Sequence, residues 1–272
     1  MAAFPGIIAL GMMLIITNDG IDLAAGSLVG FSSVVCAMLG HPGQTLLIVP
    51  IFMALLTGLL SGLITGFLVT VPKIPPFIAT LGMLSVTKGT AMIISHGLPI
   101  GDIRPEIVYL GSARIAGFLP VPILIFIILI VITHVLMSRT KLGKKIYAIG
   151  GNEQAARVCG VNVRNVRILV YMIEGFLVAV SGILLTGRIA SGAAINGTGY
   201  ELDAIAACVI GGVSMSGGSG RVMGVIFGVF IMGVLQNGLD LMGVDPNLQQ
   251  VFKGAIIIAA VVVDNVRKTS KD

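Results

Sequence analysis

The sequence contains no tryptophan and few charges: charged residues make up 11% of its 272 residues, whereas hydrophobic residues make up 56%. The mean hydropathy is +1.05. A soluble domain of this length could not expose so few charges and stay in solution. The composition therefore excludes an ordinary soluble enzyme and predicts an all-α, polytopic helical membrane protein. A β-barrel is not expected, because the apolar runs are continuous rather than alternating.

Several chemistries have no counterpart in the sequence. There is no Gly-x-x-x-x-Gly-Lys-Ser/Thr motif to cradle a phosphate and no serine in a nucleophile elbow. The three histidines and three cysteines are scattered, so they predict neither a metal site nor a disulfide framework. The net charge of +5 lies mainly in a central loop and the tail, so it indicates orientation in a membrane rather than nucleic-acid binding. We expect no catalysis, metal or cofactor in this chain, and a transporter of this composition would draw its energy from elsewhere.

What the sequence does contain is a series of apolar runs, about nine of which predict membrane segments. They cover residues 4–17, 23–39, 46–71, 77–95, 121–137, 168–187, 200–213, 222–239 and 248–263. Four segments after the central loop return the basic tail to the side of that loop. Five segments before it place Met1 on the opposite side, so we expect a further helix before Met1 and roughly ten spans in the intact fold.

One run, from Leu46 to Val71, carries Gly58, Gly62 and Gly66 at four-residue spacing. This spacing places three small residues on one helix face, which favours close contact with a second helix. A merely flexible glycine-rich helix is the alternative.

The central loop, residues 138–167, is the longest polar interval and holds seven basic residues against one acid, Glu153. A basic loop between apolar spans predicts a cytoplasmic location. Asn152 to Val158 consists of helix formers between a glycine pair and Gly160, which predicts a short helix. Such a helix could be the contact for a soluble partner, or the loop could be an ordinary basic connector that only sets topology.

Two segments read as broken or re-entrant helices. Tyr200 to Gly220 has about 13 apolar residues before a glycine run, and a short polar break that includes Asp22 precedes the run at 23–39. Their starts, GIDLAAGS and YELDAIAA, are similar, which indicates either a weak internal repeat or chance similarity between short small-residue helices. Broken helices inside a membrane line a cavity or are buried in protein, so the two segments would flank a central path.

The candidate path residues are Asp22, Ser27, Phe77, Glu174, Glu201, Asp203 and Asn237. Carboxylates inside a membrane avoid lipid, although Glu201 and Asp203 could simply favour the start of their helix. An ionised Glu174 at the bilayer centre would cost on the order of 3 kcal/mol without a partner. We therefore expect Glu174 to face the bundle interior, beside a polar group or a cation such as Lys88, or to carry a proton; a position near the cytoplasmic end is the alternative.

Five stretches, in the same order, resemble the membrane permease of bacterial ABC importers of the ribose, xylose and galactoside type. They are GIDLAAGS (20–27), PPFIATLGMLSVTKG (75–89), YAIGGNEQAARVCGVNV (147–163), GTGYELDAIAACVIGGVSMSGGSG (197–220) and QNGLDLMGVDPNLQQVFKGAIII (236–258). Together they extend over nearly the whole chain.

The resemblance implies a permease subunit for a monosaccharide in the bacterial inner membrane, with a cytoplasmic C-terminus. The implied partners are membrane lipid, a second permease copy (identical or paralogous), a periplasmic sugar-binding protein, and an ATPase with two fused nucleotide-binding modules that would hold ATP and Mg. It also implies that the central loop couples to the ATPase through Gly151, Asn152, Glu153, Ala155, Ala156, Arg157 and Gly160.

The sequence departs from the family pattern in two ways. Members usually have a helix before the segment that matches residues 1–20, so residues 1–272 would form a single permease domain that lacks the family's first helix. Glu174 stands where members more often have a small or neutral residue. Import of nucleosides or of a sugar-like signalling molecule, and a non-transporting membrane scaffold, are the alternative functions.

Overall fold

The computed structural model describes residues 2–43, 46–115 and 117–269. The described residues form twelve helices and one very short hairpin, which confirms the all-α prediction. The helices are α1 (Ala3–Thr17), α2 (Ala25–Leu39), α3 (Ile48–Thr70), α4 (Pro76–Ile94), α5 (Pro105–Ser112), α6 (Val121–Arg139), α7 (Lys141–Gly151), α8 (Glu153–Val158), α9 (Val163–Ile189), α10 (Tyr200–Ile210), α11 (Val222–Leu241) and α12 (Pro246–Thr269); the strands are β1 (Arg114–Ile115) and β2 (Leu119–Pro120).

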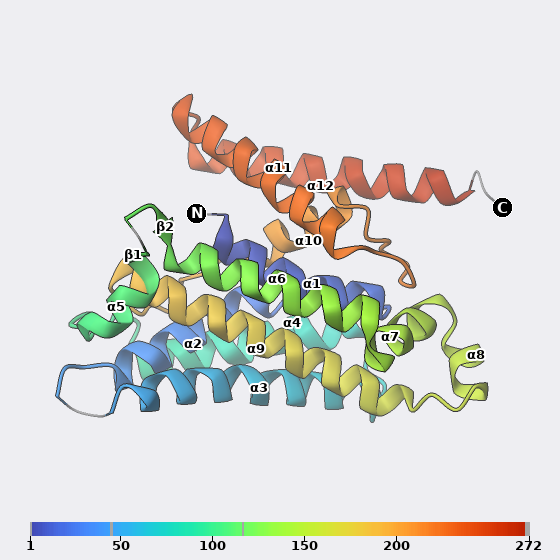
Figure 1. Ribbon diagram of the computed structural model, residues 1–272, viewed down its shortest axis with the longest axis horizontal. Helices are drawn as coiled ribbons and strands as arrows, with labels where there is room; N and C mark the ends of the chain where they lie inside the picture. Colours follow the sequence, from blue (N-terminus) through green and yellow to red (C-terminus); the bar gives the residue numbers. More distant parts are fainter. Residues whose placement is uncertain (1, 44–45, 116, 270–272) are drawn as a thin grey trace.

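Each predicted membrane segment corresponds to one helix, so the polytopic architecture is confirmed. Five helices of the described chain, α3, α4, α6, α9 and α11, are long and apolar enough to cross a membrane. Figure 1 shows them with α5 and the hairpin at one end and α7 and α8 at the other. We call these the α5 end and the α8 end.

Helix α9 is the scaffold of the bundle. It has 27 residues, which corresponds to about 40 Å, and it contacts α1, α2, α3 and α5. Its closest neighbour is α3, which approaches through the predicted glycine face. A Cβ atom on Gly58 would collide with the carbonyl of Gly175, and one on Gly62 would collide with the carbonyl of Tyr171. The expectation of close helix contact through this face is therefore confirmed.

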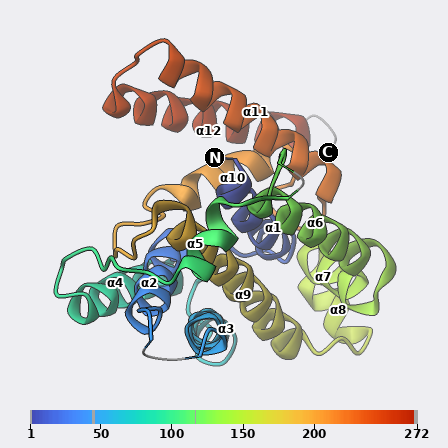
Figure 2. The ribbon, with the colours of Figure 1, turned by 60° about the vertical axis from the view of Figure 1, so that its left-hand side comes forward.

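Helix α1 occupies the centre of the bundle. Thirteen of its 15 residues are buried, and it contacts α6, α9, α10 and α11 (Figure 2). A helix that is apolar on every side can lie in lipid or be enclosed by protein, and here protein encloses it.

Two of the membrane segments combine irregular chain with a short helix, α2 in one and α10 in the other. We call α2 and α10 the partial helices. Residues 18–24 run as irregular chain along α9, where the Tyr171 hydroxyl donates to the carbonyl of Ile21 at 3.3 Å, and α2 begins only at Ala25. Residues 190–199 run as irregular chain beside α2, with Gly192 against Ala37 and Gly197 against Val29. Helix α10 then continues toward the α8 end. The acid-bearing stretches GIDLAAGS and YELDAIAA thus lie at two adjacent helix starts inside the bundle.

The structure adds elements that the sequence reading treated as loops. The interval 97–120 contains α5 and the hairpin, and the central loop contains α7 as well as the expected α8. Helix α7 buries Gly143, Ile146 and Ile149, which are spaced at three residues, and the Thr140 side chain accepts a hydrogen bond from the Gly143 N–H at its start. The lysines between these buried positions make the stretch polar on average, so its composition predicts a loop although its periodicity is helical.

The α3–α9 contact leads to a stability prediction. The methyl group of Gly62→Ala would force the backbones of α3 and α9 apart. We therefore expect this substitution to lower the free energy of unfolding by about 1–3 kcal/mol, measured by unfolding in detergent. Gly238→Ala on α11 is the matched control, because its Cβ meets open space and alanine favours a helix by up to about 1 kcal/mol. Equal effects of the two substitutions would contradict the packing described here.

Candidate functional site

The first polar cluster lies at the start of α2. The Asp22 carboxylate accepts a hydrogen bond from the Ala24 N–H at 2.6 Å. Ser27 donates its hydroxyl to the Ala24 carbonyl at 2.8 Å, and its oxygen lies 2.7 Å from the Thr87 hydroxyl oxygen of α4. These contacts hold the start of a partial helix in place and attach α4 to it.

Glu201, in the first turn of α10, lies against the first turn of α2. A Cβ on Gly26 would collide with the Glu201 carboxylate, so only glycine allows this approach. The Glu201 Oε2 atom is buried and has no hydrogen-bond partner. A carboxylate near two helix N-termini is stabilised by their positive ends. The stabilisation of a helix start by Glu201 therefore does not conflict with the predicted role of Glu201 beside a path.

Glu174 is completely buried, with 0% of its surface exposed, which confirms the expectation that it faces the bundle interior. Gly11 of α1 makes room for it, because a Cβ there would meet the Glu174 side chain at 2.8 Å. Its neighbour is the Asp22 carboxyl group. The suggested partner Lys88 is instead exposed on α4, where its charge acts on Glu201. Lys88 is therefore not the partner of Glu174, because α4 presents it to the outside of the bundle.

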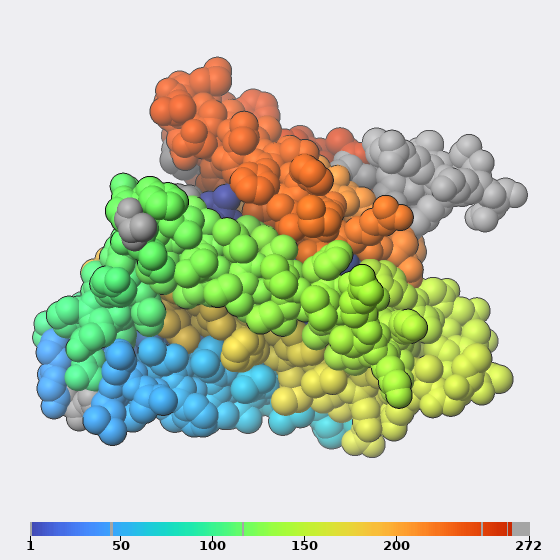
Figure 3. All heavy atoms as spheres, in the orientation of Figure 1, coloured from blue at the N-terminus to red at the C-terminus, as the bar shows by residue number. Residues whose placement is uncertain are grey.

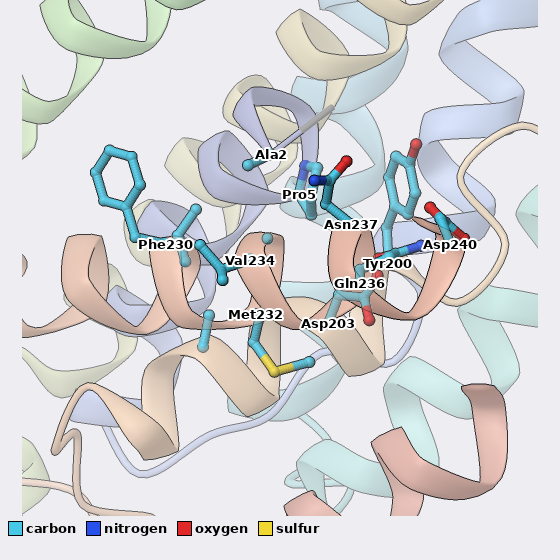
Figure 4. A pocket seen from close by; sticks show the side chains of 13 residues that line it. Ala2, Pro5, Tyr200, Asp203, Phe230, Met232, Val234, Gln236, Asn237 and Asp240 are labelled. Carbon is cyan, nitrogen blue, oxygen red and sulfur yellow. The ribbon is translucent and has the colours of Figure 1, made fainter. Parts of the chain in front are cut away.

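A second polar region is a cavity of about 580 Å³ between α1, α10 and α11 (Figure 4). Its volume falls within the range of small-molecule sites. The polar lining residues are Tyr200, Asp203, Gln236, Asn237 and Asp240, and Ala2, Pro5 and Phe230 contribute apolar surface. Two of the candidate path residues, Asp203 and Asn237, therefore lie together here.

Asp203 also forms an ion pair that ties α12 to α10. The Lys253 Nζ lies 2.8 Å from Asp203 Oδ1 and 3.1 Å from Oδ2, and the side chains are 18% and 7% exposed. Gln249, one turn earlier on α12, donates to Asp240 of α11 at 2.9 Å. Lys253 was not among the predicted site residues, although a lone cation in an apolar run was a signal that could have identified it.

The predicted path residues thus form separate groups. Asp22, Ser27, Glu174 and Glu201 cluster at the starts of α2 and α10, and Asp203 and Asn237 line the cavity. Phe77 lies at the α8 end of α4, half exposed at 54%, and the structure does not bring it to either group. Its role on a path stays a prediction, as does that of the others.

The third region is the coupling-loop candidate, where α8 forms as expected. The Asn152 side chain accepts a hydrogen bond from the Ala155 N–H at 2.9 Å and caps α8. Glu153 pairs with Arg157 at 2.6 Å and with Arg167 of α9 at 2.8 Å. Burial alone would raise the pKa of Glu153, but the bonds and charges of both arginines outweigh it and hold the pKa below its ordinary value. Arg167 is a contact that sequence spacing did not reveal.

The two alanines of α8 face different ways. Ala156 is buried against the protein, whereas Ala155 is exposed and Val158 is 89% exposed. Gly151 and Gly160, on either side of α8, each have open space at the Cβ position. The exposed surface of α8 therefore includes Ala155 and Val158, together with Gln154 and Arg157. This stretch belongs to the yellow-green surface at the right-hand end of Figure 3.

Helix α7 contacts the end of α1 and the glycine turn that follows α10. A Cβ on Gly150 would collide with the Thr17 carbonyl at the end of α1 and with the Gly218 nitrogen. The Gly218 N–H itself donates to the Thr17 carbonyl at 2.9 Å, and the Tyr147 hydroxyl donates to the Gly220 carbonyl at 2.7 Å. The loop helices therefore touch the chain just before residues 18–24 and the glycine turn just after α10.

The α10–α12 ion pair allows a direct test. Lys253→Met leaves the Asp203 carboxylate buried without its cation, so we expect a loss of about 3–5 kcal/mol in the free energy of unfolding, measured in detergent. The double variant Asp203→Asn/Lys253→Met removes both charges and should recover most of this loss. A single variant as stable as the unsubstituted protein would show that the pair does not hold α12.

The amino-acid sequence of the chain is similar to those of known transport proteins. The family model described as "Branched-chain amino acid transport system / permease component" matches residues 1–261. The ribose import permease protein RbsC of Bacillus subtilis (strain 168) is 40% identical over 264 residues, which cover 96% of this chain and 81% of the relative. The probable ABC transporter permease protein YphD of Escherichia coli (strain K12) is 40% identical over 263 residues, which cover 97% and 79%.

The L-arabinose transport system permease protein AraH of Escherichia coli (strain K12) is 36% identical over 266 residues, which cover 98% of this chain and 80% of the relative. No solved structure matches the chain significantly. The family match and the relatives each extend over almost the whole chain. This chain is similar in sequence to the ribose and L-arabinose permeases over most of their length, and it belongs to that family of transport-system permease components.

Proposed function

We propose that this chain is the membrane-spanning subunit of an ATP-driven importer that moves a monosaccharide into the bacterial cytoplasm. The names of the relatives support this substrate class, because ribose and L-arabinose permeases match the chain over nearly its full length. The cavity between α1, α10 and α11 combines apolar walls with a few polar side chains and is large enough for a solute of that size.

The charge distribution supports the orientation in the inner membrane. The basic interval 138–167 carries α7 and α8, so the α8 end faces the cytoplasm. Helix α12 runs back toward the same end (Figure 1), which supports a cytoplasmic location for the end of this helix. The α5 end then faces the periplasm, where a sugar-binding protein delivers the solute.

The contact of α7 with the end of α1 and with the glycine turn after α10 is the observation that carries the coupling proposal. ATP and Mg bind to a separate ATPase with two nucleotide-binding modules, and α8 docks on it through Ala155 and Val158. Movement of α8 passes through α7, because Gly150 of α7 lies against Thr17 at the end of α1 and against Gly218 in the turn after α10. A rigid element of this kind converts motion of a soluble partner into rearrangement of the spans.

An exposed charge supports a second permease copy. Lys88 lies in the middle of the membrane helix α4 and is exposed, although a charged group avoids the hydrocarbon core. Gly82, Ser85 and Gly89 share this exposed side of α4, and the two glycines have open space at their Cβ positions. A second copy against this side would cover the small residues and keep Lys88 away from lipid.

The docking surface predicts a loss of coupling without a loss of fold. Ala155→Trp places a large side chain on exposed surface, so we expect normal membrane abundance but loss of ATPase binding and of ATP-dependent sugar uptake. Ala155→Ser is the matched control and should keep both. Normal uptake by the tryptophan variant, at normal abundance, would show that α8 is not the docking element.

The dimer surface predicts a specific cross-link. With Cys159→Ser as background, Gly82→Cys should give a disulfide-linked dimer in oxidised membranes, because two α4 helices approach each other there. Val234→Cys on α11, which is 71% exposed, is the control and should remain monomeric. Cross-linking at position 234 but not at position 82 would place the second copy elsewhere and would leave the transport proposal intact.

A further inference from the structure

The carboxyl groups of Asp22 and Glu174 face each other deep inside the bundle. Glu174 is 0% exposed and Asp22 is 3% exposed. Neither oxygen of Glu174 accepts a hydrogen bond from a protein donor, and one oxygen of Asp22 accepts from the Ala24 N–H. The group that Glu174 meets is the Asp22 carboxyl, so two acids are each other's polar neighbour.

No cation among the described residues compensates this pair. Few titratable groups face the pair: α1 and α3 have none, and Tyr171 of α9 and Glu201 of α10 are the nearest. Asp19, in the same irregular segment as Asp22, adds a further negative charge beside Tyr171. Tyr171 uses its hydroxyl on the Ile21 carbonyl. Lys88 of α4 acts on Glu201, and Arg167 pairs with Glu153 at the α8 end.

A metal ion does not resolve the charge either, because no group of three or more His, Cys, Asp or Glu side chains in the described part of the chain is placed to hold one. Two ionised carboxylates in contact, out of water, repel each other strongly. A proton between the two carboxyl groups satisfies both of them, as in other facing carboxyl pairs.

We propose that Asp22 and Glu174 bind one proton between them, with protonated Glu174 donating its O–H to the oxygen of Asp22 that Ala24 leaves free. The single remaining negative charge lies at the N-terminus of α2, where the helix dipole stabilises it. Glu174 is then a positioning residue: together with the Tyr171–Ile21 bond, it fastens the irregular residues 18–24 to α9 and sets where α2 begins.

The proton links folding to pH. In the unfolded chain both carboxyl groups are ionised at neutral pH, whereas the folded pair keeps one proton, so the folded protein binds more protons. The free energy of unfolding therefore falls as the pH rises and the shared proton is lost. This inference does not rest on the proposed transport function, because it concerns the folded protein by itself.

The cysteines provide the measurement. Cys36 and Cys208 are buried and Cys159 is exposed, so in a Cys159→Ser background a thiol-reactive dye reports unfolding of the purified full chain in detergent. We expect the Tm of this protein to fall by about 3 °C or more between about pH 6 and about pH 9, relative to the same protein with Glu174→Gln. The glutamine amide still donates to Asp22 but has no proton to lose in this range.

Glu174→Leu is the second variant. It removes the donor and leaves the buried Asp22 carboxyl unpaired, so we expect a Tm below that of Glu174→Gln at every pH. A Glu174→Gln variant with the same dependence of Tm on pH as its parent would overturn the proposal. So would a Glu174→Gln variant that is as unstable as Glu174→Leu or does not fold, because an isosteric donor must replace a protonated carboxyl.

Discussion

Irregular chain packed between helices must find hydrogen-bond partners within the protein, and this chain has two such segments. Residues 18–24 are accommodated along α9, where Tyr171 satisfies the Ile21 carbonyl. In residues 190–199, Gly192 exchanges backbone hydrogen bonds of 2.8 and 2.9 Å with Ile100. The bundle depends on α9 for this reason: it supplies a long buried surface against which an unwound crossing can be covered by protein rather than lipid.

The glycines have a corresponding role at the α8 end. Gly150, Gly217 and Gly218 bring three distant stretches of backbone into contact, and side chains at these positions would separate them. Contacts between backbones transmit displacement with little slack, because no side-chain rotamer can absorb it. Helix α7, the end of α1 and the glycine turn after α10 are thereby joined by short, stiff connections.

The sequence predicted the features that composition and periodicity control: the membrane segments, the α3 glycine face, the partial helices, α8 and the interior position of Glu174. It did not predict α7, whose three buried positions lie among lysines, or the ion pairs of Arg167 with Glu153 and of Lys253 with Asp203. Those pairs join residues of different helices, and only the tertiary arrangement decides which helix faces are neighbours. The same limit applies to Lys88: which side of the bundle its side chain faces depends on how α4 packs against α2.

The buried position of α1 has a consequence for biosynthesis. Its main neighbours, α6, α9, α10 and α11, all follow it in the chain, and it has almost no surface left for lipid in the finished bundle. Domains generally form in the order in which the ribosome delivers them, but here an early helix has to wait for late ones. Helix α1 must first lie against lipid or the insertion machinery, and it replaces these contacts with protein contacts only when the later helices have been inserted. A ribosome that stalls before α10 would therefore leave an apolar helix without its native surroundings, a species suited to recognition by membrane quality control.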